Sequence, residues 1–170
     1  ALTTALGGRG PDTVVGKPSP ALFEVAAAHS GARKALVVGD RLDTDIEGAA
    51  RAGMDSLLVL TGVSTAADLL GAQAHERPTH VAADLAALSK PDGAARVPAW
   101  HDGHTGAGTW RVTRDGERLA LTATNDAADA EAGHPADAAR ALAAGAWAHP
   151  DWSGIVAIGA AAEHALERLG

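Results

Sequence analysis

The chain has 170 residues, with 14 Lys and Arg against 21 Asp and Glu, and therefore a formal net charge of −7. This acidic balance argues against nucleic acid or an anionic membrane as a partner, because both require a basic surface. The absence of cysteine excludes disulfides, thiolate metal sites and cysteine nucleophiles. No uncharged apolar run reaches the ~18 residues that span a bilayer, and no secretory signal pattern is present, so we expect a soluble cytoplasmic protein.

Composition changes along the chain. The later part is the more acidic one, and it contains all four tryptophans, Trp100, Trp110, Trp147 and Trp152. Residues 89–93 read Ser-Lys-Pro-Asp-Gly, and Pro and Asp-Gly are typical of loops. We therefore predict two units, residues 1–93 and residues 97–170.

Short strands and helices alternate in the first unit. Strands are predicted at 13–15, 35–39, 56–60 and 79–82, and helices at 20–29, from Asp43 or Thr44 to 52, at 65–70 and at 83–88. The run at 35–39 is apolar throughout, which suits a parallel strand covered on both faces. Asp43 or Thr44 is expected to cap the helix that follows. The alternation predicts an α/β fold with a doubly wound parallel sheet, which binds ligands beyond the carboxyl ends of its strands.

Charged residues follow two of these strands. Lys17 comes after the first strand, and the segment from Asp40 to Asp45 comes after the second. Neighbouring strands would bring the ammonium and the carboxylates into one crevice. Mg²⁺ takes one or two protein carboxylates and leaves its other positions to water and phosphate, and Lys17 would neutralise a phosphoryl group. A solvated lysine and carboxylates that stabilise a helix amino terminus explain the same residues equally well.

Several segments taken together resemble the haloacid-dehalogenase-like (HAD) superfamily, and more narrowly its class IIA branch of NagD-like and p-nitrophenylphosphatase-like proteins. The segments are GKPSP at 16–20, VGDRLDTDI at 38–46, GM at 53–54 and LVLTGV at 58–63. The resemblance extends over about residues 5–90. It implies part of a Rossmann-like HAD core.

The resemblance also implies roles for individual residues. Lys17 would be catalytic and bind the phosphoryl group, Asp40 would ligate Mg²⁺, and Asp45 would be a second catalytic acidic residue that supports the metal. The substrate side of the crevice would be lined by Lys17 and by the segment Arg41, Leu42, Asp43 and Thr44. For Arg41, bracing the loop is an equally good interpretation.

The activity implied by the resemblance is that of a phosphoric monoester hydrolase. Members of the family hydrolyse small phosphate monoesters such as glycerol 3-phosphate with Mg²⁺, through an aspartyl-phosphate intermediate. The family's nucleophilic D-x-D motif, its Ser/Thr motif and its cap are not visible in this sequence. We therefore expect a carboxyl-terminal portion that is inactive alone. Its partners would be a small phosphorylated metabolite and the missing amino-terminal part of the HAD core and cap. The alternative is a non-catalytic HAD-like scaffold or regulatory binding module, although a scaffold needs neither Lys17 nor Asp40.

The second unit is predicted to be a small α+β unit. Strands at 109–113 and 118–124 flank a glycine-containing turn and form a hairpin, and a helix at 135–147, a strand at 155–158 and a helix at 160–169 follow. This order is similar to tails that follow the phosphatase core in actinobacterial-type members, and it resembles a degenerate acetyltransferase-like fold. Its tryptophans and the strand at 155–158 would suit an interface with the core or with another subunit of a homo-oligomer.

Two features of residues 101–108 have alternative interpretations. The G-x-x-G-x-G spacing at 103–108 resembles the pyrophosphate loop of acetyltransferases, but such a loop needs a helix amino terminus behind it. We interpret it as a flexible turn without bound acyl-CoA. His101, Asp102 and His104 are potential metal ligands without a defined geometry, and we interpret them as solvated loop residues.

Overall fold

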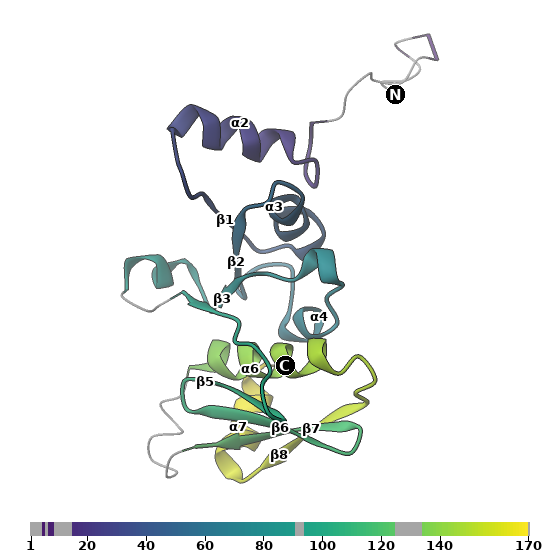
Figure 1. Ribbon diagram of the computed structural model, residues 1–170, viewed down its shortest axis with the longest axis vertical. Helices are drawn as coiled ribbons and strands as arrows, with labels where there is room; N and C mark the ends of the chain where they lie inside the picture. Colours follow the sequence, from purple (N-terminus) through teal and green to yellow (C-terminus); the bar gives the residue numbers. More distant parts are fainter. Residues whose placement is uncertain (1–4, 6, 9–14, 91–93, 125–133, 170) are drawn as a thin grey trace.

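The computed structural model describes residues 5, 7–8, 15–90, 94–124 and 134–169. It contains two four-stranded sheets that follow one another along the sequence, with strand orders β1-β2-β3-β4 and β5-β6-β7-β8. Helix α6 lies between the two sheets (Figure 1).

The first sheet is mainly parallel. β1 (Leu36–Gly39), β2 (Asp55–Val59) and β3 (His80–Ala82) pair in parallel, and β4 (Ala95–Arg96) adds an antiparallel edge. Because β2 is central, four of its five residues are buried. The sheet thus continues past residue 93, and β1 is its other edge.

The helical elements of this part are short. They are α2 (Ala21–Ser30), the π-helix η1 (Leu42–Ile46), α3 (Glu47–Arg51), α4 (Ala66–Leu70) and the 3₁₀ turns η2 (Ala74–Glu76) and η3 (Leu85–Ser89). Helix α2 has no buried residue, and it contacts α3 where the ring of Phe23 lies against the backbone of Gly48, so closely that a Cβ there would be 2.4 Å from the ring.

Three expectations for this part need correction. The predicted helix at 83–88 is a 3₁₀ turn. Asp84 caps its start, where the carboxylate accepts a hydrogen bond from the Ala86 amide. Asp43 and Thr44 do not cap a helix but lie inside η1, which has no side-chain cap. Of the strand predicted at 13–15, residues 13–14 lie outside the described residues, and Val15 is not in a strand.

The second sheet is mixed. β5 (His104–Ala107), β6 (Trp110–Asp115) and β7 (Arg118–Ala123) are antiparallel, and β8 (Gly154–Ile158) pairs in parallel with β7. Helix α6 (Pro135–Ala148) connects β7 to β8, and α7 (Ala160–Leu169) follows β8. The hairpin and both helices confirm the sequence expectation. The prediction of a flexible turn at 103–108 is wrong for residues 104–107, which form β5.

Helix α6 joins the two sheets. Its buried face consists largely of alanines, which lets it pack closely against α4 and β6. The indole N–H of Trp147 donates to the carbonyl of Leu69 at 3.0 Å, and the guanidinium of Arg140 donates to the carbonyl of Val81 at 3.0 Å. Burial lowers the pKa of Arg140, while its ion pair with Asp137 acts in the opposite direction. One continuous apolar core therefore includes residues of both sheets.

Among the described residues, no helix has the length and the apolar character needed to cross a membrane.

Candidate functional site

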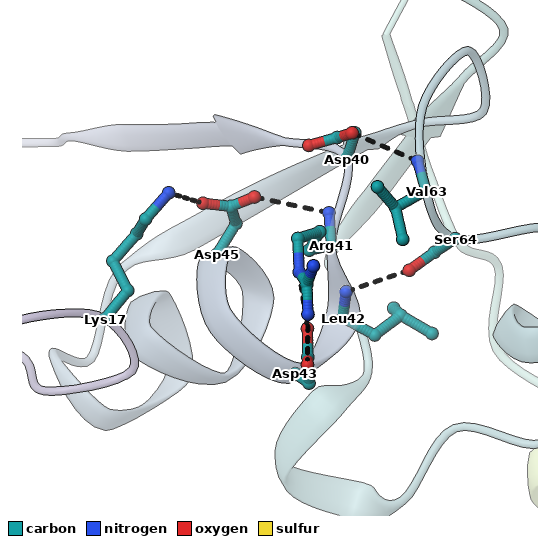
Figure 2. A network of polar contacts seen from close by, with 8 residues as sticks. All are labelled: Lys17, Asp40, Arg41, Leu42, Asp43, Asp45, Val63 and Ser64. Carbon is teal, nitrogen blue, oxygen red and sulfur yellow. Dashed lines mark hydrogen bonds and ion pairs between the residues drawn. The ribbon is translucent and has the colours of Figure 1, made fainter.

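Lys17 and Asp45 form an ion pair beside the carboxyl end of β1. The Lys17 Nζ lies 2.6 Å from Asp45 Oδ1, and the side chains are 43% and 8% exposed, respectively. The second carboxylate oxygen of Asp45 accepts the backbone N–H of Arg41 at 3.2 Å. Figure 2 shows Lys17 reaching the carboxylate from one side and the Arg41 amide from the other. Both oxygens of Asp45 are thus held by the chain itself.

A glycine makes this position of Asp45 accessible. A Cβ on Gly39, the last residue of β1, would lie 2.3 Å from the Cβ of Asp45. The Asp45 side chain can pack against the end of β1 only because Gly39 has no Cβ. The ion pair therefore depends on a residue of the strand as well as on the two charged side chains.

Asp40 is the first residue after β1, and the loop that follows β2 holds it. Its Oδ2 accepts the backbone N–H of Val63 at 3.0 Å, and its carbonyl accepts the N–H of Ser64 at 2.9 Å. A Cβ on Gly62 would lie 1.9 Å from Oδ2, so this loop touches the carboxylate directly. Within the described residues, no protein group donates a hydrogen bond to Oδ1.

Arg41 and Asp43 face each other at the start of η1. The guanidinium donates to both carboxylate oxygens, at 3.0 and 2.7 Å. This contact lowers the pKa of Asp43 and raises that of Arg41. In the structure Arg41 thus braces its own loop.

Leu42 and Thr44 belong to η1 and have different surroundings. The Leu42 side chain is buried, and its backbone N–H donates to Ser64 Oγ at 3.1 Å. The Thr44 hydroxyl is buried, with no hydrogen-bond partner among the described residues. A hollow of about 460 Å³ opens beside Arg41, Leu42 and Asp43 and extends to α4 and η2. The structure thus brings all seven predicted site residues to one end of β1, with Arg41 and Asp43 turned toward this hollow.

Sequence reasoning assigned no role to the loop after β2. Gly62 and Val63 belong to the LVLTGV segment of the resemblance, but nothing in the local pattern marks them or Ser64 as supports of Asp40. The parallel pairing of β1 with β2 brings the two loops together. The sequence signal that could have found this support is that loops after neighbouring parallel strands meet at the same edge of a sheet.

The residues around Asp40 suit a hard divalent cation. Mg²⁺ prefers carboxylate oxygens and keeps several positions for water or phosphate. Asp40 offers one carboxylate oxygen that the described protein groups leave without a donor, while Asp45 has both oxygens engaged by Lys17 and Arg41. The donor set therefore fits a metal ligand at Asp40 and a positioning carboxylate at Asp45.

A second set of potential metal ligands lies between α3 and η2. In the described ranges, one group of three His or acidic side chains has its ligand atoms within 4.8 Å, namely Glu47, His75 and Glu76. Glu47 in that group is paired with Arg51. His101, Asp102 and His104 are not grouped in this way and lie at the turn that begins β5.

The sequence matches two known protein families, one in each part of the chain. Residues 14–88 match the HAD-hydrolase-like family. This part of the chain corresponds to the carboxyl-terminal part of a HAD-like hydrolase. Residues 107–170 match the GCN5-related N-acetyltransferase-like (GNAT-like) domain. The expected resemblances to HAD hydrolases and to an acetyltransferase-like fold are both confirmed, and so is the α/β fold class.

Two of the similar proteins are phosphatases. The D-glycerol 3-phosphate phosphatase of Mycobacterium tuberculosis is 49% identical over 107 residues, which are 61% of this chain and 30% of that protein. The dihydroxyacetone phosphatase of Corynebacterium glutamicum is 36% identical over 106 residues, or 58% of this chain and 38% of that protein.

A solved structure resembles nearly the whole chain. The crystal structure of a glycerol phosphate phosphatase from Mycobacterium tuberculosis in complex with magnesium covers 99% of this chain at 38% identity, with a TM-score of 0.76. The chain covers 47% of that structure, so it spans about half the length of this relative and less of the curated ones. The HAD-like and GNAT-like units therefore occur in the same order in a magnesium-bound phosphatase.

Proposed function

We propose that this chain provides the metal-binding and phosphate-binding part of a phosphatase site for a small phosphate monoester, with glycerol 3-phosphate as the first candidate. The observation that carries the proposal is the position of Lys17, Asp45 and Asp40 at one end of β1. The phosphatases to which the chain is similar support the reaction class.

In this proposal each charged residue has a distinct task. Lys17 binds the phosphoryl oxygens and offsets their negative charge, which lowers the barrier as charge develops in the transition state. Asp45 is a positioning residue, since it holds the Lys17 ammonium and the Arg41 backbone. Asp40 is the ligand for Mg²⁺, which supplies charge neutralisation at the transferring phosphoryl group. The segment 41–44 borders the substrate.

The nucleophile comes from outside this chain in our proposal. Asp43, the other carboxylate at the loop, is engaged by both nitrogens of the Arg41 fork. The outer edge of β1 has no strand partner among the described residues, and Leu36 on that edge is 41% exposed. Leu22 and Val25 of α2 are 54% and 67% exposed. We propose that the part of a HAD core that carries the nucleophilic aspartate and the cap covers this edge.

The second unit is a non-catalytic support in this proposal. We treat residues 1–93 and 97–170 as two units. Helix α6 of the second unit packs against α4 and β3 of the first and supports the HAD-like sheet. The hydrogen bonds of Trp147 and Arg140 to Leu69 and Val81 support this assignment.

The test uses a longer version of the protein that includes an upstream D-x-D segment. Mg²⁺ is titrated into the Asp40→Asn, Asp45→Asn and Asp115→Asn variants, and hydrolysis of glycerol 3-phosphate is measured in parallel. Asp115 lies in the β6–β7 hairpin and provides a matched control. We expect the largest loss of Mg²⁺ affinity for Asp40→Asn, a smaller loss of about 10–100-fold for Asp45→Asn, and none for Asp115→Asn. Near-wild-type affinity of both Asp40→Asn and Asp45→Asn would contradict the proposal.

A further inference from the structure

An apolar hollow of about 270 Å³ lies where α4 meets the second unit. Leu70 of α4 and Leu142 of α6, both buried, lie at this hollow. Trp152, Leu166 and Leu169 contribute partly exposed apolar side chains. Apolar cavities of about 150 Å³ suffice to bind a molecule such as benzene. The hollow therefore has room for a short aliphatic or aromatic group.

A second hollow, of about 400 Å³, adjoins the first one, since Ala66 and Leu169 line both. Arg168 near the end of α7 is the one charged side chain among the described residues that line either hollow. In the described part of the chain it takes part in no hydrogen bond or ion pair with another side chain. A guanidinium in this state is suited to bind a carboxylate or a phosphate through paired hydrogen bonds.

We propose that the two adjoining hollows form one binding site for a small amphipathic anion, that is, an aliphatic chain with a carboxylate or phosphate head. The chain occupies the apolar hollow beside Leu70 and Leu142, and the head contacts Arg168. The first hollow does not suit a purely polar metabolite, because its apolar side chains offer no hydrogen bonds. The second hollow reaches Gly62 and Ser64 of the loop that holds Asp40, but none of the seven residues proposed for phosphate-ester hydrolysis lines either hollow. The binding proposed here does not depend on that activity.

The position of the site favours a small molecule over a second protein chain. The hollow lies between elements of both units, and apolar atoms of α4, α6 and α7 surround it on several sides. The single charged side chain, Arg168, lines the adjoining hollow and complements one anionic head. Burial of each methylene contributes about 0.8 kcal/mol, so the aliphatic chain supplies affinity and the head supplies selectivity.

The experiment measures binding of octanoate, octyl phosphate and 1-octanol to the complete 170-residue chain by calorimetry and by tryptophan fluorescence. Trp152 lines the hollow, so its emission is expected to shift as the ligand displaces water. We expect saturable binding of at least one anion, at least about tenfold tighter than that of 1-octanol. Comparison of octanoate with octyl phosphate identifies the preferred head group.

Two variants separate the head contact from the apolar contact. Arg168→Gln is expected to weaken anion binding by about tenfold or more and to leave 1-octanol unchanged. Arg111→Gln, which removes an equivalent exposed charge from β6, is the matched control and should change neither. Ala67→Leu, at an exposed position of α4 that borders the apolar hollow, should weaken all three ligands without altering the circular dichroism spectrum.

Three results of the binding measurements would overturn the proposal, and a fourth comes from the oligomeric state. The three binding results are no saturable binding of either anion, equal losses in Arg168→Gln and Arg111→Gln, and 1-octanol binding as tight as that of the anions. Light scattering accompanies each titration. A dimer that dissociates when Leu166→Gln is introduced would show that a second copy of the chain covers the hollow, and would likewise contradict the small-molecule assignment.

Discussion

The Lys17 ammonium lies 2.6 Å from the carboxylate of Asp45, a residue 28 positions later in the sequence. The contact ties the turn before α2 to the π-helix η1 after β1. The carboxylate is only 8% exposed, so its charge has little access to water, and the ammonium compensates it. The same contact leaves Asp45 unable to move independently of Lys17.

Replacing Lys17 with Met should therefore destabilise the chain. The substitution keeps the aliphatic stem but leaves the buried Asp45 carboxylate with the Arg41 amide as its remaining donor. Because Lys17 itself is partly exposed, we expect a loss of about 1–3 kcal/mol in the free energy of unfolding, measured by urea denaturation. Lys34→Met, at an exposed lysine, should change it by less than about 0.5 kcal/mol. Similar losses in both variants would show that the ion pair contributes nothing specific.

Gly62→Ala should disturb Asp40 in particular. The added Cβ would lie 1.9 Å from Asp40 Oδ2, so either the carboxylate or the loop must move, at a cost of about 1–3 kcal/mol in unfolding free energy. Gly16→Ala is a suitable control, because a Cβ there meets no atom within 4 Å. Urea unfolding of the two variants measures the difference. Equal stability of both would indicate that the loop shifts freely and does not fix Asp40.

Some features of this fold could be predicted from the sequence because they depend on local patterns. The continuous apolar run at 35–39 marks β1, and Thr65 with Asp68 marks the start of α4. The contacts of Asp43 could not be predicted from the sequence, because its carboxylate could either cap a helix or bind Arg41, and both alternatives fit the same residues. The amides of Asp45 and Ile46 both donate to the Arg41 carbonyl, and this π-type winding leaves no cap position at 43.

The features that sequence reasoning missed depend on pairing between distant segments. Residues 104–107 offer few large side chains, and they form β5 because β6 supplies a register from His104 to Ala107. Support of Asp40 by Val63 likewise appears only when β1 pairs with β2. Roles that arise from such pairing are not visible in the spacing of a single segment.

Arg140→Met should weaken the junction between α6 and the first sheet. The guanidinium is 7% exposed, pairs with Asp137 and donates to the Val81 carbonyl. Its loss leaves both partners without their donor, and we expect about 2–4 kcal/mol lower unfolding free energy. Arg111→Met, on the exposed face of β6, provides the comparison. A smaller loss for Arg140 than for Arg111 would mean that α6 does not depend on this contact.

Thr65 and Asp68 should make α4 sensitive to acid. The Thr65 hydroxyl accepts the Asp68 amide, and the Asp68 carboxylate accepts from the Thr65 amide and hydroxyl. These bonds lower the pKa of Asp68. A lowered pKa stabilises the folded state above the ordinary aspartate value of about 4, and this contribution is lost as the pH falls through the lowered value.

Comparison of wild type with Asp68→Asn tests this dependence. The difference in urea unfolding free energy between the two proteins should be present at pH 7 and should shrink below about pH 4. Thr65→Ala should cost about 1 kcal/mol at pH 7, as for other amino-terminal caps. A difference between wild type and Asp68→Asn that is constant from pH 7 to pH 3 would contradict the role of the ionised carboxylate.

The 170-residue chain alone should not hydrolyse p-nitrophenyl phosphate above background, even with Mg²⁺. Phosphoryl transfer of the proposed kind needs a carboxylate nucleophile in line with the leaving oxygen, and proximity of that group carries much of the reduction of the barrier. Asp40 is held by the loop after β2 and is the proposed ligand for Mg²⁺, and Asp45 is engaged by Lys17. Asp43, whose pKa the Arg41 contact lowers, is both anchored and a weak nucleophile. Release of p-nitrophenol by wild type and by Asp43→Asn should therefore be equal and at background. Sustained turnover that Asp43→Asn abolishes would show that the chain holds a complete site, and would refute the requirement for a nucleophile from outside it.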